Sequence, residues 1–152
     1  MLAAYDRPVP RYTSYPTAAQ FTSAVGPAEH ARWLSGANDD CANLYLHIPF
    51  CAELCWYCAC HTMAMRRDGT LQTYAEAMLH ELELVAPRVP DLVIDSIQWG
   101  GGTPSQLGAP RLLEVARRIS CLFDRRSGAE VSMEVVRATA PPSWPGPWRW
   151  PA

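Results

Sequence analysis

The sequence lacks the long apolar run that a membrane-spanning helix needs, since no stretch approaches about 18 apolar residues. Its first residues also lack the apolar core of a signal peptide. Lysine and arginine form no block, and 13 basic against 15 acidic residues give a formal net charge of -2. This balance provides no electrostatic footprint for nucleic acid or an anionic membrane. We therefore expect a cytoplasmic protein with small-molecule or protein partners.

Cysteine is present in an unusual arrangement, because four of the six cysteines lie within ten residues. Thiols stay reduced in the cytoplasm, so such a cluster favours metal ligation over disulfides. Cys51, Cys55 and Cys58 follow C-x3-C-x2-C spacing after an expected strand. Three thiolates on one loop can hold three corners of a four-iron cluster and leave one iron open to a substrate.

Two other interpretations of this cluster remain open. One is a structural zinc site with Cys60 or His61 as the fourth ligand, and the other is a set of unrelated thiols. Structural zinc commonly uses two separated C-x2-C pairs, and the sequence has one compact cluster. The spacing therefore favours an iron-sulfur site.

Apolar spacing predicts alternating strands and helices in a globular chain of 152 residues with 49% apolar and 18% charged residues. Helices are expected at 27–34, 70–85 and from Pro110 to Phe123, and strands at 43–48, 92–99 and 129–135. This order indicates an α/β fold of right-handed βαβ units with a parallel sheet. Sites are then expected at the carboxyl ends of the strands.

The cysteine run, Gly100–Gly102 and Glu134 all fall at such strand ends. The glycines could bring backbone close to a ligand or form only a tight turn. Glu134 could accept hydrogen bonds from hydroxyls or be an ordinary polar strand residue. His47 is interpreted as a satisfied core histidine and Cys121 as an inert core residue.

Three motifs together resemble one enzyme family. They are Tyr45-Leu-His-Ile-Pro-Phe-Cys-x3-Cys-x2-Cys, Trp99-Gly-Gly-Gly-Thr-Pro104 and Ser132-Met-Glu-Val135. Between about Tyr5 and Val135 the chain resembles the N-terminal part of the oxygen-independent coproporphyrinogen III oxidases, which are radical S-adenosylmethionine enzymes. The segment 11–17 and Cys60 resemble these oxidases more than the related haem-chaperone proteins.

The resemblance implies a fold and a set of site residues. The fold would be the N-terminal portion of an incomplete (β/α) barrel. Cys51, Cys55 and Cys58 would bind a 4Fe-4S cluster, whereas Cys60 is not expected to ligate. The residues implied to contact S-adenosyl-L-methionine are Tyr45, the backbone of Tyr57, Gly101, Gly102, Thr103 and Glu134. The family has phenylalanine where this chain has Tyr57.

The resemblance also implies a reaction in haem or chlorophyll biosynthesis. A reduced cluster would split S-adenosylmethionine, and the 5′-deoxyadenosyl radical would abstract hydrogen from a propionate of coproporphyrinogen III. Loss of carbon dioxide and an electron leaves a vinyl group, and two such events give protoporphyrinogen IX. An unidentified electron donor is implied as a partner.

Three regions are expected along the chain: an N-terminal arm with a short helix over 1–40, a partial radical-SAM core over 41–135 and an aberrant tail over 136–152. The tail is rich in proline and tryptophan where the family continues with a helix, and a shifted reading frame would explain it. The chain is thus expected to be truncated, which leaves its activity open. A non-catalytic iron-sulfur or haem-handling protein of the same superfamily and a small zinc-binding domain remain alternatives.

Overall fold

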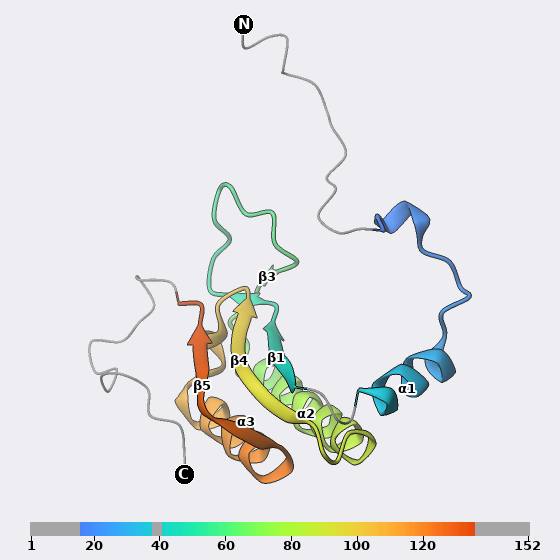
Figure 1. The fold of residues 1–152 in the computed structure, drawn as a ribbon. Coiled ribbons are helices and arrows are strands. Elements are labelled where there is room, and N and C mark those ends of the chain that lie inside the picture. The colour runs from blue at the N-terminus through green and yellow to red at the C-terminus, as the bar shows by residue number, and fades with distance from the viewer. Residues whose placement is uncertain (1–15, 38–40, 136–152) are drawn as a thin grey trace, which may run out of the picture.

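The computed structural model describes residues 16–37 and 41–135 (Figure 1). The expected tail over 136–152 lies outside the described residues, and so do residues 1–15 and 38–40 of the N-terminal region expected over 1–40. The elements, in chain order, are η2 (Ala18–Gln20), α1 (Pro27–Gly36), β1 (Cys41–Ile48), β2 (Phe50–Cys51), β3 (Met63–Ala64), α2 (Asp68–Val85), η3 (Ala86–Arg88), β4 (Val93–Gly101), η4 (Pro104–Leu107), α3 (Ala109–Leu122) and β5 (Asp124–Met133).

The main sheet has the strand order β1-β4-β5, and both pairings are parallel. Helix α2 connects β1 to β4 and α3 connects β4 to β5, and Figure 1 shows both helices on the same side of the sheet. This is the βαβαβ arrangement that apolar spacing predicted, so the α/β prediction with parallel strands is confirmed. The carboxyl ends of all three strands consequently lie at one edge of the sheet.

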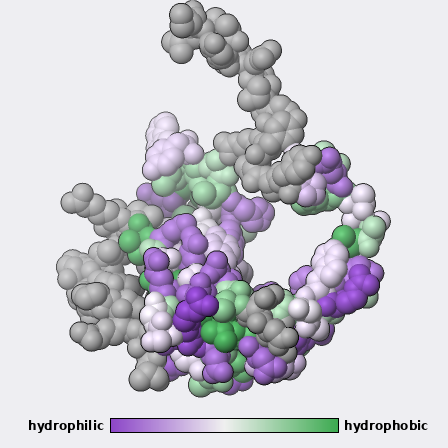
Figure 2. Space-filling model, viewed as in Figure 1, coloured by the Kyte–Doolittle hydropathy of each residue, from purple (hydrophilic) through white to green (hydrophobic). Residues whose placement is uncertain are grey.

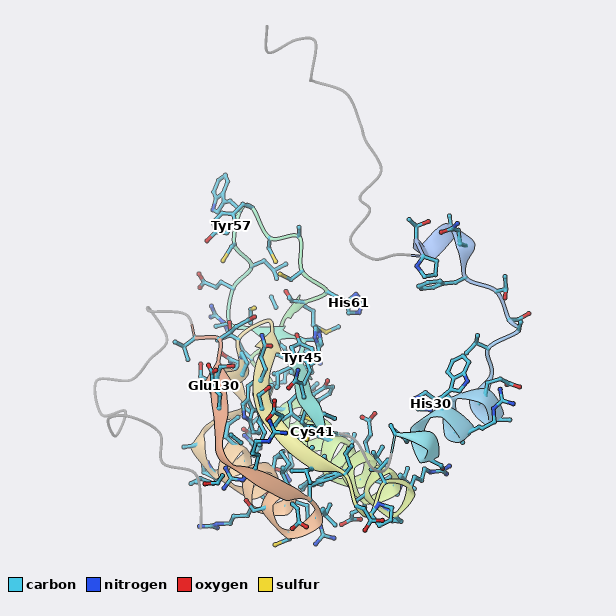
Figure 3. The ribbon with its side chains drawn as sticks, in the orientation of Figure 1. His30, Cys41, Tyr45, Tyr57, His61 and Glu130 are labelled. Atoms are coloured by element: carbon cyan, nitrogen blue, oxygen red, sulfur yellow. The ribbon has the colours of Figure 1, made fainter. Side chains whose placement is uncertain are left out.

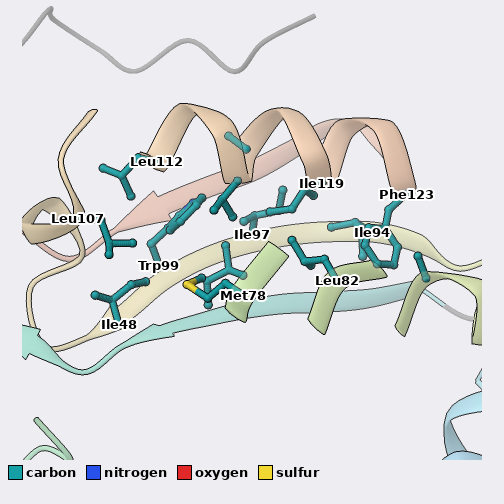
Figure 4. Close-up of a cluster of buried hydrophobic side chains, with 14 of the residues drawn as sticks. Ile48, Met78, Leu82, Ile94, Ile97, Trp99, Leu107, Leu112, Ile119 and Phe123 are labelled. Carbon is teal, nitrogen blue, oxygen red and sulfur yellow. The ribbon is translucent and has the colours of Figure 1, made fainter. Parts of the chain in front are cut away.

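Helix periodicity and strand alternation together build the core between the sheet and its helices. The buried residues of α2 are Leu71, Ala75, Met78 and Leu82, and those of α3 are Leu112, Val115, Ala116 and Ile119. They pack against fully buried Ile48, Ile97 and Trp99 from the strands, as Figure 4 shows. Burying one large apolar side chain stabilises a fold by roughly 1.5–3 kcal/mol. These buried apolar side chains therefore hold the helices against one face of the sheet.

The opposite face of the sheet carries polar side chains. Tyr45 on β1 pairs with Gln98 on β4, which pairs with Ser132 on β5, and all three are exposed. In Figure 2 hydrophilic and hydrophobic residues are mixed over the visible face of the molecule. The strand alternation thus assigns one face to the core and leaves the other for polar contacts.

Two features of the sheet differ from the sequence-based expectation. Strand β5 begins at Asp124, directly after α3, because Val93 and Ile94 pair with Asp124 and Arg125 before the register shifts. Asp124 and Arg125 show no apolar alternation from which a strand could be predicted. They are in a strand because their backbone pairs with β4. The short parallel pair β2–β3 was also not predicted, since two residues are too few for a periodic signal.

No helix among residues 16–37 and 41–135 is long and apolar enough to cross a membrane.

Candidate functional site

Backbone hydrogen bonds tie the carboxyl ends of the three main strands together. The N–H of Gly102, after β4, donates to the carbonyl of Ile48 on β1 over 2.8 Å. The N–H of Glu134, after β5, donates to the carbonyl of Trp99 over 2.9 Å. The glycine run and Glu134 therefore meet at one edge of the sheet, as the sequence predicted.

The cysteine loop, residues 51–62, begins at the last residue of β2, rises from this edge and is closed at its base by the pairing of β2 with β3 (Figure 1). The N–H of Met63 donates to the carbonyl of Pro49 over 2.7 Å, and the N–H of Met65 donates to that of Cys51 over 2.8 Å. The upper part of the loop is open to solvent, and Figure 3 shows Tyr57 near its outer end. The base of the loop is thus fixed by backbone pairing.

The thiols of the cysteine loop differ in their surroundings. Cys51 is half-buried and accepts a hydrogen bond from the Thr103 hydroxyl over 3.3 Å, whereas Cys55, Cys58 and Cys60 are exposed. A backbone hydrogen bond from Cys60, helped by the hydroxyl of Thr62, lowers the pKa of Cys58. The charge of Cys58 in turn raises the pKa of Cys60. Of these two, Cys58 is the better thiolate, and the thiolate is the form that binds metals.

The three cysteines of the predicted cluster share this loop without being gathered around one point. Within the described residues, no group of three or more His, Cys, Asp and Glu side chains is arranged to hold a metal ion. Ligation by Cys51, Cys55 and Cys58 therefore stays a prediction.

Two glycines of the run permit close approaches that a side chain would block. A β-carbon on Gly102 would lie 2.8 Å from the carbonyl oxygen of Phe50 and 3.0 Å from Cys51 Sγ. Gly101 has a φ of 106°, in the left-handed region, and a β-carbon there would lie 2.7 Å from the His47 ring. The backbone after β4 can therefore lie directly against β2 and the first cysteine.

Tyr45 and Glu134 approach each other across Gly100. The Tyr45 hydroxyl oxygen and Glu134 Oε1 lie 2.9 and 3.2 Å from the place where a β-carbon of Gly100 would stand. Partial burial, followed by the charges of Glu134 and Cys60, raises the pKa of Tyr45. Tyr45 thus stays protonated and can donate a hydrogen bond beside the Glu134 carboxylate.

His47 links Tyr45 to the cysteine loop. Its Nε2 lies 3.1 Å from the carbonyl oxygen of His61, which can only accept, so Nε2 carries the hydrogen. Its Nδ1 then accepts from the Tyr45 hydroxyl, 3.1 Å away. The prediction of a satisfied histidine is confirmed, but the residue is half-buried at the edge of the site and not in the core. Sequence patterns gave no signal for this link.

The predicted site residues are brought together around one open cavity of about 880 Å³. All but Tyr45 contribute to its lining, which includes Cys51, Cys55, Tyr57, Cys58, Gly101, Gly102, Thr103 and Glu134. Tyr45 lies beside it and lines a second cavity of about 390 Å³ between β1 and α2. The arrangement combines thiols, backbone groups and a carboxylate at one opening.

One sequence-based interpretation is wrong. Cys121 was expected in the core, and the structure places it on the exposed surface of α3. The buried stripe of that helix ends at Ile119, and two residues further along a helix the side chain lies on the opposite side. Cys121 therefore lies far around the helix from the core.

Comparison with known proteins gives a consistent match. No family model matches the chain. The oxygen-independent coproporphyrinogen III oxidases of Paracoccus denitrificans and Bradyrhizobium diazoefficiens are 40% and 39% identical to it over 136 and 132 residues. These alignments cover 88% and 84% of this chain. The match is to oxygen-independent coproporphyrinogen III oxidases. The chain spans 30% and 29% of the length of these two relatives.

A solved structure agrees with the sequence match. Coproporphyrinogen III oxidase from Escherichia coli, described as a radical SAM enzyme, superimposes with a TM-score of 0.76 at 30% identity. The alignment covers 89% of this chain and 30% of that one. The predicted resemblance is confirmed, and so is the fold prediction of a portion of a radical-SAM α/β structure. Enzymes of the radical SAM class use an iron-sulfur cluster and S-adenosylmethionine in general.

Proposed function

We propose that this chain is the part of an oxygen-independent coproporphyrinogen III oxidase that binds a 4Fe-4S cluster and S-adenosyl-L-methionine. The activity it would serve is the oxidative decarboxylation of coproporphyrinogen III propionates to vinyl groups, which gives protoporphyrinogen IX. The observation that carries the proposal is the convergence of the cysteine loop, the glycine run and Glu134 on one cavity. An external electron donor is part of the proposal, because the cluster must be reduced.

The residues at the cavity fit these two groups chemically. Cysteine thiolates are the usual ligands of iron-sulfur clusters, and Cys58 has a lowered pKa. Gly102 leaves no room for a side chain beside Cys51 Sγ, so its backbone groups could approach a ligand bound next to that thiol. A carboxylate such as Glu134 can accept hydrogen bonds from ribose hydroxyls or an amine.

Each part of the chain would then have a defined task. Cys51, Cys55 and Cys58 would hold the cluster, which with S-adenosylmethionine supplies the 5′-deoxyadenosyl radical for hydrogen abstraction from the substrate. Gly101, Gly102 and Thr103, together with the backbone of Tyr57, would orient the S-adenosylmethionine.

Two further residues would bind the same ligand from the strands. Glu134 would accept hydrogen bonds from it, and the Tyr45 hydroxyl oxygen, whose hydrogen is donated to His47, would accept one. His47 would also keep the cysteine loop aligned with β1 through the carbonyl of His61.

Binding of S-adenosylmethionine by the reconstituted full chain tests this proposal. The chain is loaded anaerobically with iron and sulfide and equilibrated with labelled S-adenosylmethionine. Glu134→Gln should weaken binding at least about tenfold, since a lost charge-assisted hydrogen bond costs roughly 1.5–3 kcal/mol. Glu130→Gln is the matched control, because Glu130 is an exposed carboxylate on β5, the strand that Glu134 follows. Equal affinities of both variants and the unmodified chain would contradict the assigned role of Glu134.

A second measurement separates catalysis from binding. The loaded chain is reduced with dithionite, and formation of methionine and 5′-deoxyadenosine is followed with coproporphyrinogen III present. Cleavage with vinyl formation supports the oxidase. Cluster loading without cleavage supports the non-catalytic iron-sulfur alternative, and retention of zinc without iron supports the zinc-domain alternative.

A further inference from the structure

Thr62 is the last residue of the cysteine loop and stands between two of its thiols. The hydroxyl oxygen of Thr62 lies 3.9 Å from Cys51 Sγ and 3.9 Å from Cys58 Sγ. Pairing of β2 with β3 fixes this position, since Met63 follows Thr62 and pairs with Phe50, next to Cys51. The backbone is also held on both sides of Thr62. The N–H of Thr62 donates to the carbonyl of Cys60 over 2.9 Å, and the N–H of Met63 donates to the carbonyl of Pro49 over 2.7 Å.

Thr103 supplies a second hydroxyl to one of these thiols, that of Cys51. Its side chain is 2% exposed, and its hydroxyl donates to Cys51 Sγ over 3.3 Å. Its N–H donates to the carbonyl of Phe50 over 2.8 Å, which fixes the hydroxyl beside Cys51. The two threonines therefore come from different segments of the chain, because Thr103 follows β4 and Thr62 precedes β3.

The number of hydrogens that the two threonine hydroxyls can donate determines which hydroxyl bonds to Cys51 and which to Cys58. A threonine hydroxyl has one hydrogen to donate, and a thiolate can only accept. Thr103 already lies closer to Cys51 Sγ than Thr62 does. Once both cysteines are thiolates, the Thr62 hydrogen is therefore available to Cys58.

We propose that Thr62 is a positioning residue for the cluster, whose hydroxyl donates to the Cys58 thiolate while Thr103 donates to Cys51. This inference rests on the proposed function, because it takes both cysteines as cluster ligands. A hydrogen bond to a ligating sulfur stabilises the more negative, reduced cluster and raises its reduction potential. The two threonines would thus help an external donor to reduce the cluster.

Redox titration of the reconstituted full chain, followed by electron paramagnetic resonance and without S-adenosylmethionine, tests this inference. Thr62→Val keeps the β-branched shape and removes the donor, so the reduction potential should shift to more negative values. Thr62→Ser keeps a hydroxyl and should restore the potential. Thr73→Val is the matched control, because the exposed Thr73 hydroxyl donates to Gly69 on α2, over 3.0 Å. Thr62→Ala is measured as well, so that a folding defect of one variant does not decide the result.

The outcomes separate this inference from the proposed function. Normal iron loading with a lower potential in Thr62→Val and Thr62→Ala, and recovery in Thr62→Ser, supports the role of Thr62. Normal loading with one potential in all variants overturns that role and leaves the cluster site standing. An unmodified chain that takes up no iron and sulfide overturns the cluster site, and the role of Thr62 with it.

Discussion

Two tryptophans show how differently the core and the cysteine loop are stabilised. Trp99 on β4 is 0% exposed between the sheet and its helices, whereas Trp56 in the cysteine loop is 106% exposed. The core is held by apolar burial, and the loop is held by backbone pairing at its base. The comparison teaches that the scaffold does not need the loop for its stability. The loop can therefore be devoted to ligand binding.

Replacing the two tryptophans is the strongest test of this contrast. Trp99→Ala should lower the free energy of unfolding by about 3–5 kcal/mol, because it leaves a cavity in a fully buried site. Trp56→Ala should change it by no more than about 0.5 kcal/mol. Urea unfolding of both variants, followed by circular dichroism, gives the two values. Equal losses would mean that the cysteine loop is part of the core.

Glycine substitutions test the contact between the two regions. Gly102→Ala should lower the free energy of unfolding by about 1–3 kcal/mol, since its β-carbon would press on the Phe50 carbonyl and on Cys51 Sγ. Gly69→Ala is the control, because its β-carbon would meet nothing within 4 Å and alanine favours the helix. The control should be neutral or stabilising by up to about 1 kcal/mol. Urea unfolding measures both, and a stable Gly102→Ala chain would contradict the close approach.

Two ion pairs, one between the core helices α2 and α3 and one at the cysteine loop, allow the same comparison. Arg111 is 18% exposed and donates to Leu107 and Gln72 as well as to Asp68, so Arg111→Met should cost about 1–2 kcal/mol of unfolding free energy. Arg66 is 67% exposed in its pair with Glu53, so Arg66→Met should cost about 0.2–1 kcal/mol. Thermal and urea unfolding give the ranking. A larger loss of unfolding free energy in Arg66→Met than in Arg111→Met would contradict the view that the core, and not the cysteine loop, carries the stability.

The smallest effect is expected at the strand ends, where the two regions meet. Burial and the negative charge of Glu134 disfavour the Tyr45 phenolate, so its pKa lies above the ordinary value. Glu134→Gln removes that charge and should lower the Tyr45 pKa, and Glu130→Gln should not. Absorbance at 295 nm against pH, with Tyr45→Phe subtracted, isolates the residue. An unchanged Tyr45 titration midpoint in Glu134→Gln would contradict the electrostatic effect of Glu134 on Tyr45.

Much of the fold was predictable because the buried apolar residues of helices and strands recur at regular spacings in the sequence. The apolar positions of α2 and α3 and the alternation in β1 and β4 mark the core directly. The same logic brought Glu134 and the glycine run to one edge, since both follow parallel strands. The start of β5 escaped prediction because Asp124 and Arg125 pair through backbone and bury no apolar side chain.

The finer contacts of the site were not predictable. The contacts of Thr62 and His47 are made by individual side-chain atoms, and such contacts produce no repeating pattern in the sequence. Cys121 was misplaced because overlapping apolar faces on α3 did not fix which side of the helix is buried.

The iron and sulfide content of the anaerobically reconstituted full chain tests the central claim most directly. A cluster on three thiolates predicts about four iron and four sulfide per chain, lost in Cys51→Ser, Cys55→Ser and Cys58→Ser. Cys121→Ser, on the outer surface of α3, should keep the full content. A chain that retains zinc and no sulfide, or whose iron content does not depend on the three cysteines, would contradict the account.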